Sequence, residues 1–292
     1  MNYGPLVFLA AFFALSSSWF AFVLTPQIQL GNEPQATNIV NTAELYPQAR
    51  PGAAAQGLQV YRANGCAYCH SQQVGQSGVA VDVVLTETGT NLATIADIIK
   101  QANSSATVAG LAGDLPKIVI QGANIVDATA LVKALKAAGA KSEARVIPTG
   151  TDIARGWGTR RTVSTDYIFD SPVMLGSLRV GPDLANIGAR SPDANAHLVH
   201  LYAPRATMPG SAMPSYRFLF EARKIHAKPS PDALKLPLEF AAPAGFEIVP
   251  KPEARELVAY LLSLHADAPL FAAPLSAPLA VKAAGATNAP AK

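Results

Sequence analysis

The amino-acid sequence predicts a mainly α-helical protein with an N-terminal transmembrane helix and a small α/β insert that interrupts its soluble domain. Three observations support this fold class. An uncharged apolar stretch lies near the start of the chain, amphipathic helical patterns flank the middle region, and the middle region alternates between strand-like and helix-like segments. The length of 292 residues is enough for two modest domains.

The first element is the apolar stretch from Pro5 to Leu24, which carries no charge. As an α-helix rising about 1.5 Å per residue, it spans roughly the 30 Å hydrocarbon core of a bilayer. A cleaved signal peptide is the alternative, but Met1 to Gly4 lacks Lys and Arg, and no A-x-A site follows Leu24. Residues 1–26 are therefore predicted to be a retained anchor in contact with membrane lipid.

The segment after the anchor predicts both a linker and an orientation. Residues 27–50 are rich in Pro, Gln, Asn and Thr, which is typical of a solvated linker. Lys and Arg are absent from Thr25 until Arg50, whereas Glu33 and Glu44 are present. Because cytoplasmic loops carry an excess of Lys and Arg, we expect the rest of the chain to lie outside the cytoplasm.

Two helices are predicted to pack together in a soluble domain made of residues 51–78 and 148–265. The first runs from Ala53 to Ala63, with Gly57, Leu58 and Tyr61 on one face. The second begins at Pro252, which suits a first helical turn. Its apolar stripe at positions i, i+3, i+4 and i+7 consists of Leu257, Tyr260, Leu261 and Leu264.

Residues 79–147 predict the α/β insert. The expected order is strand Val79–Thr86, helix Asn91–Ala102, strand Pro116–Gln121, helix Asp127–Ala138 ended by Gly139, and strand Ala144–Ile147. The runs DVVLTETGTNLATIADIIKQA and DATALVKALKAAGAKSEARVI resemble the C-terminal domain of the bacterial ribosomal stalk protein. That domain recruits translation factors through a basic, Gly-rich helix, whereas Thr107 to Lys117 offers a single lysine here, so the resemblance implies a fold only. A partner-binding appendage and an inert insertion both remain open.

The remaining bulk properties concern the tail and the charge. Residues 266–292 are dominated by Ala and Pro, which predicts a disordered tail. The 23 Lys and Arg residues stand against 20 Asp and Glu residues, giving a net charge of +3, and no run of five basic residues occurs. Nucleic-acid binding is therefore not expected.

The chemistry-bearing motif is Cys66-Ala67-Tyr68-Cys69-His70, the attachment signature of a c-type haem. In such a motif the two thiols form thioethers with the haem vinyl groups, and the adjacent imidazole becomes an axial iron ligand. A redox dithiol would not explain His70, and zinc would need two further Cys or His ligands although no second cysteine pair exists. The sequence therefore predicts one covalently bound haem c on Cys66, Cys69 and His70.

The second axial ligand is expected to be a methionine, because a thioether favours reduced iron in an electron-transfer haem. Met1 lies at the anchor, and Met174 lies in an apolar run that favours a core role. Met208 and Met213 are each followed by proline in the loop APRATMPGSAMPSYRF, and either is a plausible ligand, with gap-filling in the core as the alternative. His197, His200 and His226 are lesser candidates.

Gly181-Pro182-Asp183-Leu184 resembles the Gly-Pro-x-Leu loop of class I cytochromes c. In those proteins the proline carbonyl accepts the second imidazole N–H of the axial histidine, which fixes the ring and tunes the iron. Pro182 is accordingly expected to accept a hydrogen bond from His70, and the soluble domain to have a class I-like cytochrome c fold.

Three stretches resemble one family: YRANGCAYCHSQQV, RGWGTRRTVSTDYIFDSPVMLGSLRVGPDLANIGAR and HLVHLYAPRATMPGSAMPSYRFLFE. They are similar to the monohaem cytochrome c subunit, subunit II, of cbb-type haem-copper cytochrome c oxidases. The resemblance implies that Met213, in the pattern P-x-S-x-M-P-x-Y, is the axial methionine and that Met208 has a supporting role. The family usually carries Met-Ile-Arg-Pro after the haem motif, which this chain lacks, so Arg179, Arg160 or Arg161 is expected to supply the cation near the haem propionates.

The resemblance also implies a place in a complex. Members of this family sit in the bacterial inner membrane with the haem domain on the periplasmic side. They relay electrons from a further c-type cytochrome toward the b haem and haem-copper centre of the catalytic subunit, where oxygen is reduced to water. Two alternatives stay open: a free-standing membrane-anchored electron carrier, and an enzyme acting at its own haem, which would need an open sixth iron position.

Overall fold

The computed structural model describes residues 3–38, 43–50, 52–102, 108, 111, 113 and 115–273. The chain forms two compact units. Unit 1 contains the described residues of Met1–Gly75 and Asp152–Ala273, and unit 2 contains those of Gln76–Thr151. The unit boundaries lie close to the predicted edges of the insert, and unit 2 is a few residues longer at each end because the first and last strands of the insert in chain order are longer than the sequence pattern indicates.

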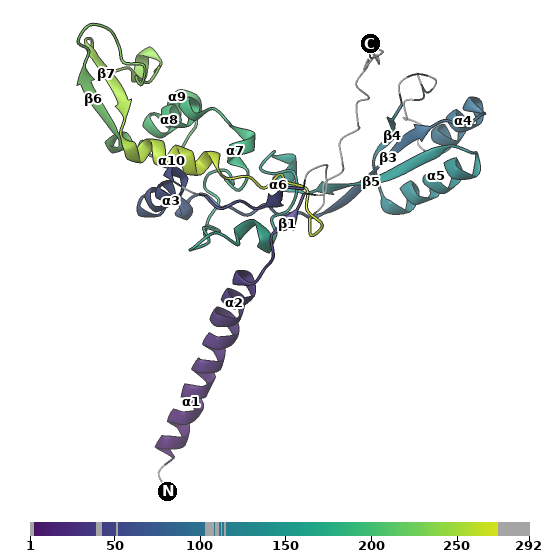
Figure 1. The fold of residues 1–292 in the computed structure, drawn as a ribbon, viewed down its shortest axis with the longest axis horizontal. Helices are drawn as coiled ribbons and strands as arrows, with labels where there is room; N and C mark the ends of the chain where they lie inside the picture. Colours follow the sequence, from purple (N-terminus) through teal and green to yellow (C-terminus); the bar gives the residue numbers. More distant parts are fainter. Residues whose placement is uncertain are drawn as a thin grey trace, which may run out of the picture. The chain divides into compact units, whose positions relative to one another are not determined.

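The N-terminal helix is continuous from Gly4 to Gly31, and it is long and apolar enough to cross a membrane. It consists of α1 (Gly4–Trp19), the π-helical turn η1 (Phe20–Leu24) and α2 (Thr25–Gly31). Figure 1 shows it as one unbroken helix from α1 to α2. None of these residues is buried. The helix extends beyond the predicted anchor, into the segment expected to be a linker.

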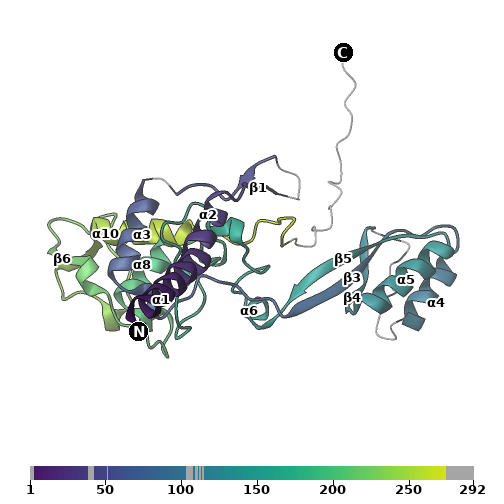
Figure 2. The same ribbon diagram turned by 90° about the horizontal axis from the view of Figure 1, so that it is seen from below.

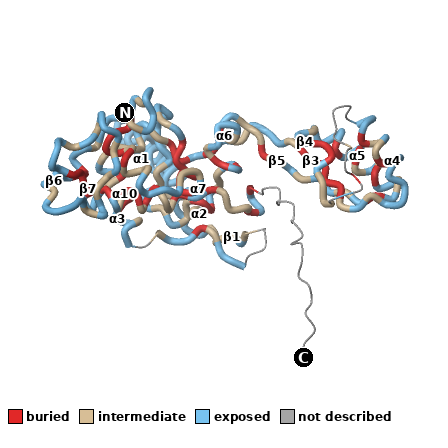
Figure 3. Tube along the Cα trace, turned by 90° about the horizontal axis from the view of Figure 1, so that it is seen from above, coloured by how far each residue is buried: buried red, intermediate tan, exposed pale blue. Residues whose placement is uncertain are grey.

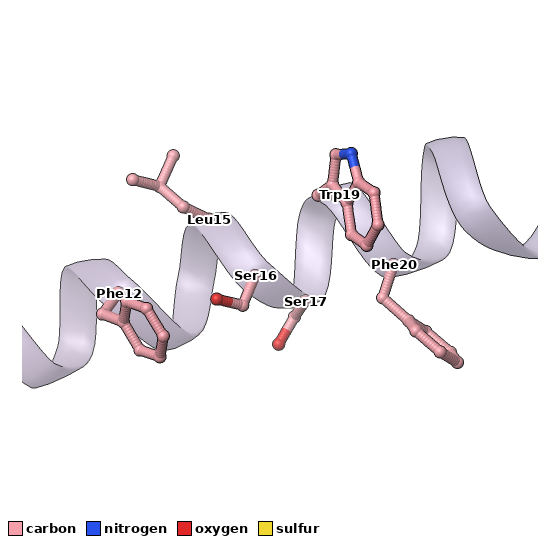
Figure 4. Close-up of a pocket in the computed structure, with 6 residues that line it drawn as sticks. All are labelled: Phe12, Leu15, Ser16, Ser17, Trp19 and Phe20. Carbon is pink, nitrogen blue, oxygen red and sulfur yellow. The ribbon is translucent and has the colours of Figure 1, made fainter.

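Pro26 explains the π-helical turn. Proline has no N–H to donate to the carbonyl four residues back, and its ring collides with that carbonyl, so the regular hydrogen-bond ladder cannot continue there. The Thr25 backbone N–H instead bonds the Phe20 carbonyl, which also accepts the Thr25 hydroxyl at 2.9 Å. Figure 4 shows the helix surface just before this turn, where a shallow hollow is lined by Phe12, Leu15, Ser16, Ser17, Trp19 and Phe20. This hollow lies on one helix and is not an enclosed cavity.

The rest of the predicted linker makes more contacts than its composition indicates. Strands β1 (Ala36–Thr37) and β2 (Leu45–Tyr46) pair with each other. The Tyr46 hydroxyl donates to the carbonyl of His265, and Arg50 forms an ion pair with Asp170. The linker prediction is therefore wrong for the residues that lead into the helical unit, because single long-range contacts leave no pattern in the sequence.

Unit 1 is built around two packed helices, α3 (Ala53–Ala63) and α10 (Pro252–Leu262), both at the predicted positions. Gly57 brings them close, since a Cβ at this position would lie 1.9 Å from the Glu256 carbonyl oxygen. The rings of Tyr61 and Tyr260 meet across the helices with their centroids 5.2 Å apart. The predicted apolar stripe of α10 is buried, as Figure 3 shows along this helix.

The other elements of unit 1 surround this pair. They are α6 (Thr151–Ala154), α7 (Ile187–Arg190), α8 (Ala194–Tyr202), α9 (Pro204–Thr207), the hairpin of β6 (Phe220–Lys224) and β7 (Phe246–Pro250), and the 3₁₀ turns η2 (Cys66–Tyr68), η3 (Ser164–Tyr167), η4 (Arg217–Leu219) and η5 (Leu238–Phe240). Side chains from α7, α8 and β7, such as Ile187, Leu201 and Ile248, share one buried cluster with Tyr61 and Leu257.

Unit 2 is a three-stranded antiparallel sheet with two helices. The strand order is β4 (Lys117–Ala123), β3 (Gly78–Glu87), β5 (Lys141–Thr149). Helices α4 (Leu92–Ala102) and α5 (Ile125–Ala137) lie beside each other against the sheet (Figure 2). Ile95, Ile99, Leu131 and Leu135 of the helices share one core with Val83 of β3. Every predicted strand and helix of the insert occurs, and the resemblance to the stalk-protein domain stays a prediction.

The predicted disordered tail is ordered at its start. Ala266, Leu270 and Ala273 are buried, and Leu270 pairs with Ala273 in an isolated β-bridge. The Arg160 Nε donates to the Ala268 carbonyl at 2.5 Å. The prediction is therefore wrong for residues 266–273. Their composition favours disorder, but these residues have buried apolar side chains, and Ala268 accepts a hydrogen bond from the buried Arg160. Residues 274–292 lie outside the described residues.

Candidate functional site

The C-x-x-C-H motif forms a compact turn directly after α3. Gly65 adopts the left-handed conformation with φ +67°, which a residue with a side chain rarely adopts, and it starts the 3₁₀ turn Cys66–Tyr68. The amides of Cys69 and His70 both donate to the Cys66 carbonyl, at 3.2 and 3.0 Å. The turn therefore fixes both cysteines and His70 relative to one another.

The two cysteines are free thiols in different surroundings. Cys66 is half-buried and packs on the core cluster around Tyr61, whereas Cys69 is exposed. Burial raises the pKa of Cys66 to about 11. The cysteines that attack in C-x-x-C oxidoreductases have a lowered pKa, so this environment does not favour a redox dithiol.

His70 is oriented by the loop that contains Pro182. Its Nδ1 lies 2.8 Å from the Pro182 carbonyl oxygen, the contact that the sequence predicts. Because a carbonyl can only accept, Nδ1 carries the proton, and Nε2 of the neutral ring has its lone pair free for a metal. The Gly181 and Ser177 amides hold the same loop on the motif by donating to the Cys69 and Ala67 carbonyls at 2.9 and 3.1 Å.

Two glycines make this close approach possible. A Cβ at Gly181 would lie 2.3 Å from Cε1 of the His70 ring. A Cβ at Gly176 would lie 2.4 Å from the His70 carbonyl oxygen, and Gly176 also has φ +82°. A side chain at either position would force the loop away from His70.

The two candidate methionines differ in their surroundings. Met213 is half-buried and packs on the same core cluster as Cys66, and its amide bonds the Ser211 hydroxyl at 3.2 Å. The side chain of Met208 is 61% exposed. Met174 packs against the core, in line with the role its apolar neighbours suggest.

The histidine candidates are placed as follows. His197 Nε2 contacts the Ser191 carbonyl at 2.8 Å, and His226 is exposed. His200 Nδ1 contacts the Thr207 hydroxyl at 2.5 Å. The pKa of His200 is lowered, first by burial and then by the charges of His197 and His70.

Arg179 bonds the segment that follows His70. Its Nε donates to the Ser71 hydroxyl at 2.9 Å, and its guanidinium also bonds the Gln73 carbonyl and, at 3.0 Å, the carboxylate of Asp152. A propionate contact of Arg179 stays a prediction. Sequence reasoning missed this set of partners, because Asp152 carries no motif and lies far along the chain.

The other two arginines have different partners. Arg160 is fully buried and forms a bidentate ion pair with Asp166, in which Nη2 donates to Oδ1 at 2.8 Å and Nη1 donates to Oδ2 at 3.0 Å. Its other bonds go to the carbonyls of Arg161 and Ala268, so Arg160 holds two backbone segments together, and a propionate contact of Arg160 stays a prediction. Arg161 donates to the Ala272 carbonyl at 2.7 Å.

Asp183 is a further residue to which the sequence assigned no role. It is fully buried, and its carboxylate accepts from the Ser71 hydroxyl at 2.5 Å and from the Gln73 amide at 2.7 Å. Its place in the Gly-Pro-x-Leu loop was the available signal. Tyr216 was also missed; it is partly buried and packs on the same core cluster as Cys66 and Met213.

The residues present fit a covalently attached haem. The turn presents two thiols and an imidazole whose Nε2 is not used by the bond to Pro182. Because Gly181 has no Cβ, its backbone can approach the His70 ring closely. Beside Gly181, the apolar side chains of Leu178 and Val180 are 60% and 65% exposed, which suits contact with an apolar macrocycle. In the part of the chain that the structure describes, no three His, Cys, Asp or Glu side chains gather as a metal-ion site, so no ligand set for zinc is found there.

Comparison with known proteins gives one family match. Residues 145–244 match the family described as cytochrome C oxidase, mono-heme subunit/FixO. The matched stretch contains Arg179, Pro182 and both candidate methionines, and it begins after most of unit 2. No curated protein matches the chain. Over this stretch the chain is similar to the mono-haem subunit of a cytochrome c oxidase.

Proposed function

We propose that this protein is a membrane-anchored monohaem c-type cytochrome that relays electrons within a cbb-type haem-copper oxidase. The observation that carries the proposal is the bond from His70 Nδ1 to the Pro182 carbonyl, which leaves Nε2 of a C-x-x-C-H histidine free to bind iron. The match of residues 145–244 to the oxidase mono-haem subunit supports the same conclusion.

Each residue of the site has a defined task in this proposal. Cys66 and Cys69 would hold the haem through thioethers, and His70 and Met213 would ligate its iron. The half-buried position of Met213 on the core shared with Cys66 favours it over the exposed Met208. Bound there, the haem supplies a one-electron redox centre. Pro182 fixes the imidazole ring and its tautomer.

The helical unit suits a class I-like cytochrome c domain built from residues 51–78 and 148–265. The close packing of α3 on α10 at Gly57 supports this interpretation, because it fixes the helix that directly precedes the haem motif. The insert is then an addition between the haem motif and the methionine loop.

The N-terminal helix is proposed to be the membrane anchor in the bacterial inner membrane, with the haem domain in the periplasm. The helix Gly4–Gly31 has the length and composition for this task. The absence of Lys and Arg between Thr25 and Arg50 supports the orientation.

The proposed partners are the catalytic haem-copper subunit and a further c-type cytochrome subunit. The chain itself is then an electron relay, and oxygen is reduced in the catalytic partner. A free-standing anchored carrier is the alternative, and it would need no tightly bound partner.

The test is purification of the tagged chain from its native membranes in mild detergent, followed by optical difference spectra, copper analysis and oxygen uptake on one sample. We expect a c-type signal together with b-type haem, copper and oxygen consumption. As a control, the chain is purified after detergent conditions that separate membrane complexes, and oxygen uptake should then be lost. A c-type signal alone, in detergent that preserves complexes, would favour the free-standing carrier.

A further inference from the structure

A buried carboxylate, Asp152, lies where the chain re-enters unit 1 after unit 2. Asp152 is 6% exposed, and its carboxylate oxygen Oδ2 accepts from the Gly75 amide at 2.7 Å. Gly75 and Asp152 are the residues of unit 1 on either side of Gln76–Thr151. Asp152 therefore joins the entry and the exit of the insert within unit 1.

The same carboxylate holds Arg179. Arg179 Nη1 lies 3.0 Å from each carboxylate oxygen of Asp152, and the guanidinium carbon lies 5.5 Å from the centre of the Trp157 ring. On its other side, Arg179 bonds the Ser71 hydroxyl and the Gln73 carbonyl. The guanidinium thus connects Asp152 to Ser71 and Gln73, in the segment that directly follows His70.

Asp183 completes the arrangement from the Pro182 loop. It lies 3.8 Å from Arg179 and accepts from the Ser71 hydroxyl, while the Leu184 amide donates to the Ser71 carbonyl at 2.8 Å. One guanidinium therefore faces two buried carboxylates. The Arg179 side chain is 38% exposed, whereas both carboxylates are buried, so loss of Arg179 would leave two buried carboxylates without their cation.

We propose that Asp152 is a positioning residue for the haem site: it holds Arg179, and through Arg179 it fixes the segment Ser71–Gln73 that follows the axial histidine. The inference rests on the proposed haem attachment at Cys66, Cys69 and His70. Gly75 and Asp152, the residues of unit 1 that flank the insert, then help to position the haem site, because Asp152 bonds both Gly75 and Arg179.

The substitutions that test this are D152N, R179Q and R179K. Asparagine keeps one acceptor oxygen but loses the negative charge and the second of the two oxygens that lie 3.0 Å from Arg179 Nη1, so D152N weakens the hold of residue 152 on Arg179. Lysine keeps the positive charge of Arg179 but cannot reproduce its planar set of donors. R255Q is the matched control, because it breaks an exposed ion pair with Asp232 in the same unit.

Two properties of the detergent-purified full chain are measured: the midpoint potential of the haem, and the rate at which ferric haem binds added cyanide. We expect D152N to raise the potential, because an anion near the haem is lost, and R179Q to lower it. We expect faster cyanide binding in D152N, R179Q and R179K, with no further increase in the D152N/R179Q double variant. R255Q should match the unmodified chain in both measurements.

Haem staining of the denatured proteins distinguishes failure of the proposed function from failure of the positioning role of Asp152. Absence of covalent haem from the unmodified chain would overturn the proposed function and this inference with it. If covalent haem is present throughout, cyanide binding in R179K equal to that of the unmodified chain would show that only charge matters and would overturn the positioning role. Additive effects of D152N and R179Q would do the same. If D152N does not accumulate, the comparison of R179K with R179Q still decides.

Discussion

Gly181 is the residue whose lack of a side chain most directly shapes the site. An alanine Cβ there would lie 2.3 Å from the His70 ring, so the ring or the Pro182 loop must move in G181A. We expect a larger fraction of ferric haem that binds added ligands and a changed midpoint potential, because the bond from His70 to Pro182 is weakened. Optical titration with cyanide measures the first effect.

Gly210 provides the control for this change. It lies in the loop between Met208 and Met213, and a Cβ there would meet nothing within 4 Å. G210A should therefore match the unmodified chain. Identical behaviour of G181A and G210A would mean that the approach of His70 to the Gly181 backbone is not important for the site.

The two methionines are distinguished by a second pair of variants. M213A should retain covalent haem but bind carbon monoxide when reduced, because the sixth iron position is opened. M208A should not, since its side chain is 61% exposed and is not assigned to the iron. Carbon monoxide difference spectra measure this, and a reversed result would exchange the roles of Met208 and Met213.

At the scale of the elements, the contact between α3 and α10 depends on the missing side chain of Gly57. In G57A the new Cβ would lie 1.9 Å from the Glu256 carbonyl oxygen, so the helices must separate. Overpacking in a core typically costs about 1–3 kcal/mol, and we expect the free energy of unfolding to fall by at least ~2 kcal/mol. Chemical denaturation of the full chain in detergent, followed through the haem absorbance, measures this loss.

Gln56 is exposed beside Gly57 on the same helix. Q56A should leave the unfolding midpoint nearly unchanged, because it removes no buried contact and alanine favours the helix. If G57A is as stable as Q56A, the two helices do not depend on a glycine at their contact.

The elements that the sequence predicts well are those with a repeated local pattern. Helices α3 and α10 and the five elements of the insert each show helical or strand periodicity, and their observed bounds lie close to the predicted ones. The turn at Cys66–His70 and its bond to Pro182 follow from two short motifs. These features need only local sequence and a recognisable spacing.

The features that the sequence does not predict depend on single contacts between distant residues. Asp152 bonds Arg179, Tyr46 bonds the carbonyl of His265, and Arg160 bonds the carbonyl of Ala268 in the segment 266–273. None of these residues belongs to a periodic pattern. A composition rich in Ala and Pro indicates disorder for the tail, but one buried guanidinium that needs acceptors is enough to order its first residues.

At the scale of the whole molecule, the insert is a separate compact unit whose two connections lie together. The Ser77 amide bonds the Thr149 carbonyl at 2.9 Å, and the Gly75 amide bonds Asp152. Replacing residues 76–151 by a short Gly-Ser linker should therefore leave covalent haem and a c-type spectrum. Haem staining and optical spectra of the shortened chain check this; loss of covalent haem would show that the helical unit needs the insert to fold.

The central claim is that this chain carries one covalent haem ligated by His70 and a methionine. The most direct test is a reduced-minus-oxidised optical spectrum of the purified chain, with haem staining after denaturation and the C66A variant measured in parallel. We predict a c-type spectrum of six-coordinate haem, one haem per chain that survives denaturation, and impaired covalent attachment in C66A. A chain without covalent haem, or C66A with normal haem staining, would contradict the account.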